Sequence, residues 1–301
     1  MVKRFSLIWL FASFLGGIGV SEIYSIFFSP LIKGTPEAEH FNPKRFPPQQ
    51  AYRSFPRCSY ERIPLVSGML ETAEFLLYHP NISFIRFGDA DIHLLQGRSL
   101  VYQNASSDLV KALYKCFTTD DPSIAIGLPD IFSGYAPVKH DTQLYWDRRD
   151  GWRRWILKHV NFERRYFQTW ISQMYEATAG THCLNLPLIY GTLRKIWENK
   201  DIILVRGDNK QVYDYDIFDV AKSQKVIFAP RTHAWSAYDE LYKQLLAEPA
   251  DKLYIFTCGH VGKVLTYDMA KLGRRALDLG HLSKDYDAYY GKKSLKDFYK
   301  D

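Results

Sequence analysis

The sequence predicts an α/β fold, a Rossmann-like and largely parallel sheet with helices on both faces. Short apolar runs of strand length alternate with longer stretches of helical spacing. Several of these runs end in a turn that carries glycine or a polar residue. The chain has 301 residues, of which 47% are hydrophobic, so it is long enough to bury a large core.

Six apolar runs define the predicted sheet. They lie at residues 83–87, 124–128, 201–205, 225–229, 253–257 and 276–279. Runs of this length are typical of strands that are buried on both faces of a parallel sheet. Their order along the chain, with helices between them, predicts successive strand–helix crossovers.

Five stretches with helical spacing lie between or before these strands. They cover residues 61–78, 107–117, 214–223, 234–246 and 261–272, and a further helix begins near Ile92. The spacing predicts helices that pack on the two faces of the sheet.

The first thirty residues have a different composition. Lys3 and Arg4 precede an apolar run over 5–20, and a second apolar stretch reaches residue 28. Because no small-x-small cleavage site follows, we interpret 1–30 as an uncleaved membrane signal anchor rather than a cleaved signal peptide or a core helix. Residues 31–63, rich in Pro, Asn, Gln and charge, are the predicted stalk, and 64–301 the folded domain. The basic residues predict a cytosolic N-terminus, so this domain is expected outside the cytosol, in the Golgi or ER lumen of a eukaryote.

The net charge of +6 and the aromatic content of 16% favour an anionic partner such as a nucleotide, a phospholipid surface or an acidic glycan. The chain lacks the dense basic runs of nucleic-acid-binding proteins, so no nucleic-acid partner is expected. Its four cysteines show no Cys-x-x-Cys spacing, which argues against a zinc site: Cys58, Cys116, Cys183 and Cys258. Asn81 and Asn104 begin glycosylation sequons.

The turn after the first predicted strand carries two carboxylates, Asp89 and Asp91, directly behind Gly88. In open α/β sheets, ligands bind beyond the carboxyl ends of the strands, where these side chains would lie. Carboxylate oxygens suit Mg²⁺ or Mn²⁺, which keep several waters and also bind substrate phosphates. The turn therefore predicts a divalent cation and a phosphate-bearing substrate. The alternative is that Asp89 caps the following helix and Asp91 favours its positive end.

Polar residues also follow or close other predicted strands, at the same edge of the sheet: Asp130, Asp208, Gly259, His260, Asp278 and His281. The free amides after Gly259 are candidates for phosphate binding, although Val264 stands where a P-loop needs Ser or Thr. His281, with Asp278 close by, is a candidate contact to a cation or phosphate. Arg86 either reaches this site or braces the end of its strand.

Residues 145–155, followed by Arg164 and Arg165, mix arginines with tryptophans. Aromatic faces stack on sugars, and guanidinium groups bind phosphate or carboxylate. The alternative is an amphipathic helix whose tryptophans anchor it to the core.

Several segments resemble the glycosyltransferases of the GT-D fold, a family found among bacterial enzymes that glycosylate serine-rich adhesins. The similar segments are 83–89, 126–130, 195–205, 265–273 and 276–281, and their order and spacing agree from about Pro64 to Tyr290. Two departures lie in the metal motif, where Ala90 replaces the usual glycine and Asp91 the usual glutamate. The poor match over 181–187 leaves the acceptor open.

The resemblance implies a metal-dependent glycosyltransferase domain over 64–301. It would transfer a hexose from a nucleotide sugar, UDP-glucose or another UDP-hexose, to a glycan or glycoprotein. Mn²⁺ or Mg²⁺ would be held by Asp89, Asp91 and His281. The donor would contact Arg86, Gly88, Asp130, Gly259 and His260, and the catalytic candidates are Asp89, Asp208 and Asp278.

If the enzyme inverts the anomeric centre, Asp208 or Asp130 is the candidate base. Two other functions remain open, a metal-dependent phosphoesterase and a non-catalytic, membrane-anchored glycan-binding protein. A phosphoesterase with two metals generally needs more ligands than the sequence offers.

Overall fold

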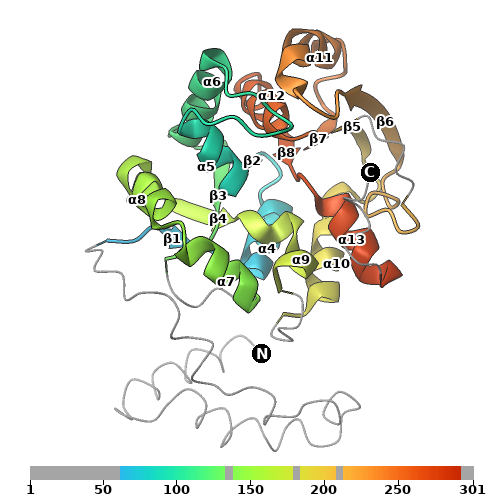
Figure 1. Ribbon diagram of the computed structural model, residues 1–301. Coiled ribbons are helices and arrows are strands. Elements are labelled where there is room, and N and C mark those ends of the chain that lie inside the picture. The colour runs from blue at the N-terminus through green and yellow to red at the C-terminus, as the bar shows by residue number, and fades with distance from the viewer. Residues whose placement is uncertain (1–61, 133–137, 179–183, 208–212, 293–301) are drawn as a thin grey trace, which may run out of the picture. The chain divides into compact units, whose positions relative to one another are not determined.

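The computed structural model describes residues 62–132, 138–178, 184–207 and 213–292 (Figure 1). Over these residues, eight strands form one sheet in which every pairing is parallel. The strands are β1 (Leu65–Val66), β2 (Ser83–Arg86), β3 (Ile124–Leu128), β4 (Arg165–Gln168), β5 (Asp201–Gly207), β6 (Ser223–Ala229), β7 (Leu253–Thr257) and β8 (Ala276–Asp278). The predicted α/β class with a parallel sheet is confirmed.

Ten α-helices connect or follow these strands in the described ranges. They are α4 (Met69–Tyr78), α5 (Asp89–Leu95), α6 (Ser107–Phe117), α7 (His140–Asp147), α8 (Asp150–His159), α9 (Met174–Thr178), α10 (Leu186–Trp197), α11 (Tyr238–Leu246), α12 (His260–Lys271) and α13 (Leu282–Gly291). Two short 3₁₀ helices, η4 (Thr169–Ser172) and η5 (Ala234–Ala237), precede α9 and α11.

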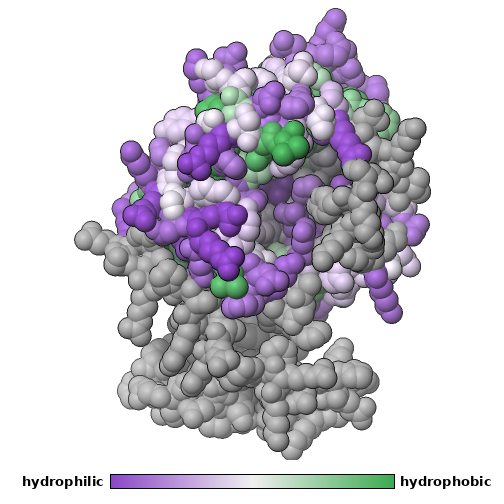
Figure 2. All heavy atoms as spheres, in the orientation of Figure 1, coloured by the Kyte–Doolittle hydropathy of each residue, from purple (hydrophilic) through white to green (hydrophobic). Residues whose placement is uncertain are grey.

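The order of the strands creates a crevice at the centre of the sheet. The order is β1-β4-β3-β2-β8-β7-β5-β6. From β2, the strands β3 and β4 follow outward on one side of the centre, whereas β5 to β8 lie on the other side. Such a switch in winding direction is where ligands bind in open α/β sheets, beyond the carboxyl ends of the strands. Figure 2, in the orientation of Figure 1, shows a hollow over these central strands, lined mostly by hydrophilic side chains.

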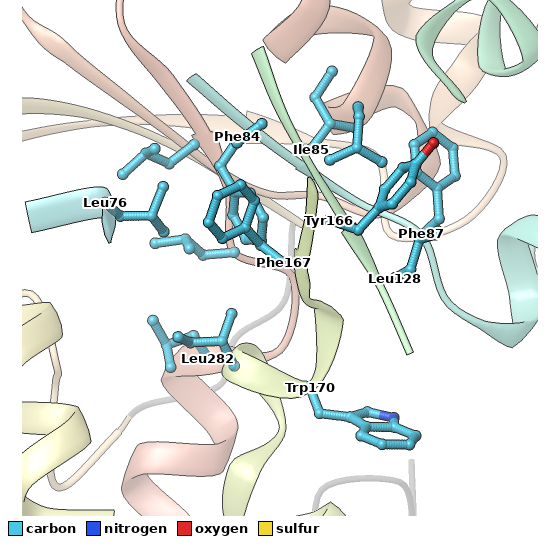
Figure 3. Packing of buried hydrophobic residues seen from close by; sticks show 14 of the residues in the cluster. Leu76, Phe84, Ile85, Phe87, Leu128, Tyr166, Phe167, Trp170 and Leu282 are labelled. Atoms are coloured by element: carbon cyan, nitrogen blue, oxygen red, sulfur yellow. The ribbon is translucent and has the colours of Figure 1, made fainter. Parts of the chain in front are cut away.

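Helices cover both faces of the sheet. In Figure 1, α6, α12 and α11 lie above the strands and α4, α10 and α13 lie below them. Side chains of β2 alternate between the two layers: Figure 3 shows Phe84 beside Leu76 and Phe167, and Ile85 beside Tyr166. Phe84 and Ile85 are fully buried, as expected for a central parallel strand that is covered on both sides. This packing fixes the position of the turn that follows β2.

Two helix predictions need correction. The predicted helix 61–78 begins only at Met69, because Pro64 disfavours a helical residue before it and β1 then pairs with β4. The predicted helix 214–223 is a series of turns, and its last residue, Ser223, opens β6. The backbone N–H groups of Asp214 and Tyr215 donate to the Asp287 carboxylate at 3.1 and 3.0 Å, so a tertiary contact determines the start of this segment.

Two strands, β1 and β4, were not predicted from the sequence. β1 has only two residues, and β4 begins at Arg165, within a stretch whose arginines and aromatic residues suggested a binding surface. Tyr166 and Phe167 of β4 are buried in the core. Short strands with polar ends give little periodic signal, so pairing with β3 and β1 is what defines them.

The predicted anchor, Cys58 and Cys183 lie outside the described residues, as does the stalk apart from its last two residues. Within the described ranges, the helices are too short or too polar to cross a membrane. Cys116 and Cys258 are buried free thiols.

Candidate active site

The turn between β2 and α5 places two carboxylates at the central crevice. Gly88, in an extended conformation, is the N-cap of α5, and Asp89 and Asp91 are the first and third helical residues. The Asp91 Oδ2 atom accepts a 2.8 Å hydrogen bond from the Gly88 backbone N–H. Acidic side chains in the first turn are favourable because they compensate the positive end of the helix. Helix capping is therefore performed by Asp91, whereas the alternative interpretation had assigned it to Asp89.

Asp91 is buried, with 4% of its surface exposed. Its Oδ1 atom lies 2.7 Å from His260 Nδ1 and 3.5 Å from Lys263 Nζ, both on α12. Burial alone would raise the pKa of Asp91, but the Lys263 ammonium and the bond to His260 lower it to about 2. Asp91 is therefore ionised throughout the physiological pH range.

Lys263 joins Asp91 to a second buried carboxylate, Asp278 at the end of β8. Its Nζ atom donates to Asp278 Oδ2 at 3.0 Å. Arg86, the last residue of β2, donates from its backbone N–H to Asp278 Oδ2 at 3.2 Å and from Nη2 to Oδ1 at 3.4 Å. The neighbouring strands β2 and β8 are thus joined at their carboxyl ends by ion pairs and hydrogen bonds.

Arg86 braces the strand ends rather than projecting into solvent. Its Nε atom donates to the Asp278 carbonyl at 3.0 Å, and only 7% of the residue is exposed. Gly280 follows β8 with a φ of +46°, and a Cβ atom at that position would lie 1.8 Å from Arg86 Nη2. Only glycine therefore fits beside this guanidinium group.

Asp89 has a different environment. The residue is half-buried, and its Oδ2 atom accepts a 2.7 Å hydrogen bond from the Tyr145 hydroxyl of α7. The Arg149 guanidinium lies 3.6 Å from the centre of the Tyr145 ring. The arginine and aromatic segment thus contacts the predicted metal motif through Tyr145, while Trp146 is buried in the core as the alternative interpretation expected.

Tyr102 lies at the rim of this cluster. Its ring is parallel to that of His260, with centroids 6.0 Å apart, and 47% of the residue is exposed. Burial of part of the side chain, together with the charges of Asp91 and Asp89, raises the pKa of Tyr102 to about 12. The Tyr102 carbonyl accepts a 2.7 Å bond from the His233 backbone N–H, which ties its loop to the segment after β6.

The structure brings together most of the predicted site residues. Arg86, Gly88, Asp91, His260 and Asp278 form one contiguous network, with Asp89 and Gly259 adjacent to it in the chain. Gly259 has a φ of +72° and is the N-cap of α12, so the predicted helix start is found there.

His281 lies close enough to that network for the charges of Arg86 and Lys263 to act on it. His281 is exposed at the N-cap of α13. Desolvation, followed by the charges of Lys284 and Arg86, lowers the pKa of His281, and since the residue is exposed we attribute the shift mainly to the charges. Asp130 is half-buried beyond β3, and Asp208 lies outside the described residues.

Three residues of the site were not predicted, namely Lys263, Tyr145 and Tyr102. Lys263 lies three residues after His260 and thus on the same helical face, a spacing that is visible in the sequence. Tyr145 and Tyr102 reach the site from separate loops and helices. Nothing in their local sequence indicates these contacts.

The predicted metal ligands fit a cation only in part. Among the described residues, no three His, Cys, Asp or Glu side chains are grouped as a metal site. Both oxygens of Asp91 accept hydrogen bonds or pair with Lys263. Asp89 is half-buried and has no cationic partner within the described ranges, so it fits a cation that is also held by substrate phosphates.

A cavity of about 400 Å³ lies at the opposite, amino edge of the sheet. It is lined by residues before or at the start of β2, β3 and β4, among them Ile82, Ile124 and Arg165. Because the network of buried charges lies at the carboxyl edge, we place the candidate active site there and not in this cavity.

Two curated relatives from streptococci are similar to the chain. Glycosyltransferase GlyD of Streptococcus pneumoniae serotype 4 is 28% identical over 74% of the chain, and the probable glycosyl transferase Gly of Streptococcus gordonii is 29% identical over 75%. The alignments cover 27% and 33% of these two proteins, so the chain spans about a third or less of their length.

Solved structures with the same fold give a consistent result. A structure of the highly conserved domain of unknown function 1792, described as having a distinct glycosyltransferase fold, matches with a TM-score of 0.70 and 27% identity, over 76% of this chain and 83% of that one. A new glycosyltransferase of the same domain type from Streptococcus sanguinis matches with a TM-score of 0.68 and 27% identity, over 77% and 87%. The model of the glycosyltransferase GT-D fold family matches residues 84–297. The chain therefore belongs to the glycosyltransferases of the GT-D fold.

Proposed function

We propose that this protein transfers a hexose from a nucleotide sugar, UDP-glucose or another UDP-hexose, to a glycan or glycoprotein acceptor. The observation that carries the proposal is the cluster of cationic and imidazole side chains at the central crevice, namely Arg86, His260 and Lys263 held around two buried carboxylates. A glycosyltransferase must stabilise the negative charge of a departing diphosphate, and preorganised positive groups do this without reorganisation.

The paired charges of the cluster do not repel an anionic ligand. Asp91 and Asp278 contribute two negative charges, and Arg86 and Lys263 contribute two positive charges, so the carboxylates are already neutralised. The N-terminus of α12 adds its positive end and free backbone amides beside Gly259. A diphosphate placed there would meet no uncompensated carboxylate of this cluster.

We further propose that Asp89 would hold a divalent cation together with the donor phosphates. When bound, Mg²⁺ or Mn²⁺ would act as a Lewis acid that neutralises the leaving diphosphate. Tyr145 would orient the Asp89 carboxylate through its hydroxyl group. The exposed Tyr102 ring offers a face on which the sugar or the base of the donor could stack.

The proposals for the acceptor and for the location of the enzyme are based on the sequence. We propose a membrane-anchored enzyme whose catalytic domain acts outside the cytosol, because the charged and apolar layout of residues 1–30 is typical of a signal anchor. A glycan or glycoprotein acceptor is the proposal that agrees with this location.

A thermal-shift panel tests the choice of donor. Ligands that bind the folded state raise the melting temperature, and a concentration of 100 times Kd corresponds to about 2.7 kcal/mol. We expect a UDP-hexose with Mn²⁺ to give the largest shift, larger than the free sugar or inorganic phosphate. No shift with any nucleotide sugar would contradict the proposal, and release of phosphate from a generic phosphoester without sugar transfer would favour a phosphoesterase.

A further inference from the structure

One ring nitrogen of His260 is held by the buried carboxylate of Asp91. Its Nδ1 atom lies 2.7 Å from Asp91 Oδ1, and 7% of the residue is exposed. His260 is the first residue of α12, directly after Gly259. Its imidazole ring is stacked against the ring of Tyr102. Both the position and the plane of the imidazole are thereby fixed.

This contact determines the tautomer of neutral His260. Asp91 Oδ2 accepts from the Gly88 N–H and Oδ1 faces the Lys263 ammonium, so this carboxylate is an acceptor and Nδ1 is the donor of the 2.7 Å bond. The lone pair of the neutral ring is therefore on Nε2. Among the described residues, none makes a hydrogen bond to Nε2. Nε2 is nevertheless absent from the buried polar atoms that lack a partner, so it is in contact with solvent. Nε2 is thus an acceptor that is not sealed from solvent.

We propose that Asp91 and His260 form an acid–base pair in which His260 is the general base that activates the acceptor. This inference rests on the proposed glycosyl transfer. As the acceptor O–H bond breaks, its proton passes to Nε2, and the oxygen forms a bond to the anomeric carbon. The bond between that carbon and the phosphate oxygen breaks, and its electron pair leaves with the diphosphate. One displacement of this kind inverts the anomeric configuration.

The other acids of the crevice are less suited to this role. Asp278 is 1% exposed and accepts hydrogen bonds from Lys263 and Arg86, so an acceptor cannot reach it. Asp89 binds the Tyr145 hydroxyl and is the proposed cation ligand. Asp91 itself is buried and acts through His260, which makes it a positioning residue.

Sugar transfer and donor binding are measured separately on His260→Gln, with His159→Gln as the matched control. His159 lies on α8, where it stacks on Trp155 away from the crevice. Because general base catalysis contributes about 10²–10⁴-fold, we expect kcat to fall by that factor in His260→Gln while the Kd of the UDP-sugar changes by less than about threefold. His159→Gln should resemble the wild type, and Asp91→Asn should lower kcat with little change in the donor KM.

Two further measurements distinguish the loss of a catalytic group from a loss of activity caused by misfolding. In His260→Ala, added imidazole should restore a measurable part of the transfer rate, which a purely structural defect would not allow. The product of the wild type should have the anomeric configuration opposite to that of the donor.

Transfer by His260→Gln within about threefold of the wild type, absence of imidazole rescue, or retained configuration would each overturn the inference. These outcomes are distinct from failure of the proposed function, in which the wild type would neither bind nor transfer a nucleotide sugar.

Discussion

Asp89 and Asp91 are separated by one residue, yet their surroundings give them different roles. Asp91 is buried, caps α5 and is neutralised by Lys263 on α12. Asp89 is half-buried and bonded only to an uncharged hydroxyl among the described residues. An Asp-x-Asp pattern cannot reveal this division, because it depends on which side chains of a distant helix pack against each carboxylate.

The low pKa of Asp91 makes the stability of the protein dependent on pH. Its pKa is about 2 in the folded chain, below the ordinary value of 3.8, so the folded state favours the ionised form. This stabilisation is complete above about pH 4 and is lost as the pH falls through about 2. We expect urea unfolding to show that the wild type loses about 2 kcal/mol more than Asp91→Asn between pH 5 and pH 2. Parallel pH profiles for the two proteins would contradict this expectation.

Tyr145 should control how well Asp89 holds a cation. Removing its hydroxyl in Tyr145→Phe takes away the 2.7 Å bond that orients the carboxylate. Loss of such an outer-shell partner typically weakens metal binding 10- to 100-fold, and we expect about a tenfold rise in the Mn²⁺ concentration that half-saturates donor binding in calorimetry. Tyr238→Phe is the matched control, since its hydroxyl bonds Asp268 at 2.7 Å on α12. Equal Mn²⁺ requirements in both variants would show that Tyr145 has no such role.

At the scale of helices and strands, the candidate site depends on contacts between the carboxyl ends of neighbouring strands. β2 and β8 are joined by the bonds between Arg86 and Asp278, and the start of α12 presents His260 and Lys263 to the same point. Strand and helix boundaries here follow local signals, so Ser107–Phe117, Ile124–Leu128 and Leu253–Thr257 match the predicted limits. The turns over 214–222 do not, because the Asp287 carboxylate binds the backbone of Asp214 and Tyr215.

Gly280 should be more sensitive to substitution than another glycine of similar conformation. In Gly280→Ala the new Cβ would collide with Arg86 Nη2, in addition to the cost of a positive φ. We expect the free energy of unfolding to fall by about 3 kcal/mol or more. Gly273→Ala is the control: its φ is +73°, no atom lies within 4 Å of the added Cβ, and it should cost about 1 kcal/mol. Urea denaturation measures both, and equal losses would contradict the close approach of Arg86 to Gly280.

In the molecule as a whole, the candidate active site is assembled from segments that are far apart in the sequence. Asp91 and His260 are separated by 169 positions, and Arg86 and Asp278 by 192. The sequence could predict that several strand ends share one edge, since all parallel strands point the same way. It could not predict the order β3-β2-β8-β7, which brings only some of these ends together, because strand order is set by long-range pairing.

This arrangement explains which predicted residues form the site. The turns after β2, β7 and β8 converge because these strands are neighbours or one strand apart. Asp130 follows β3, also next to β2, yet the cluster of buried charges is built from the β8 side by α12. Lys263 and His260 were within reach of prediction as a pair on one helical face, whereas the loop of Tyr102 and helix α7 of Tyr145 carry no such pattern.

The most direct test of the central claim is to measure release of UDP from UDP-hexoses by the full-length protein with an acceptor glycan. We predict release coupled to sugar transfer in the presence of Mn²⁺, a large loss with a chelator, and a comparable loss in Asp89→Asn. Transfer that is indifferent to both the chelator and Asp89→Asn, or no transfer and no binding with any nucleotide sugar, would contradict the account.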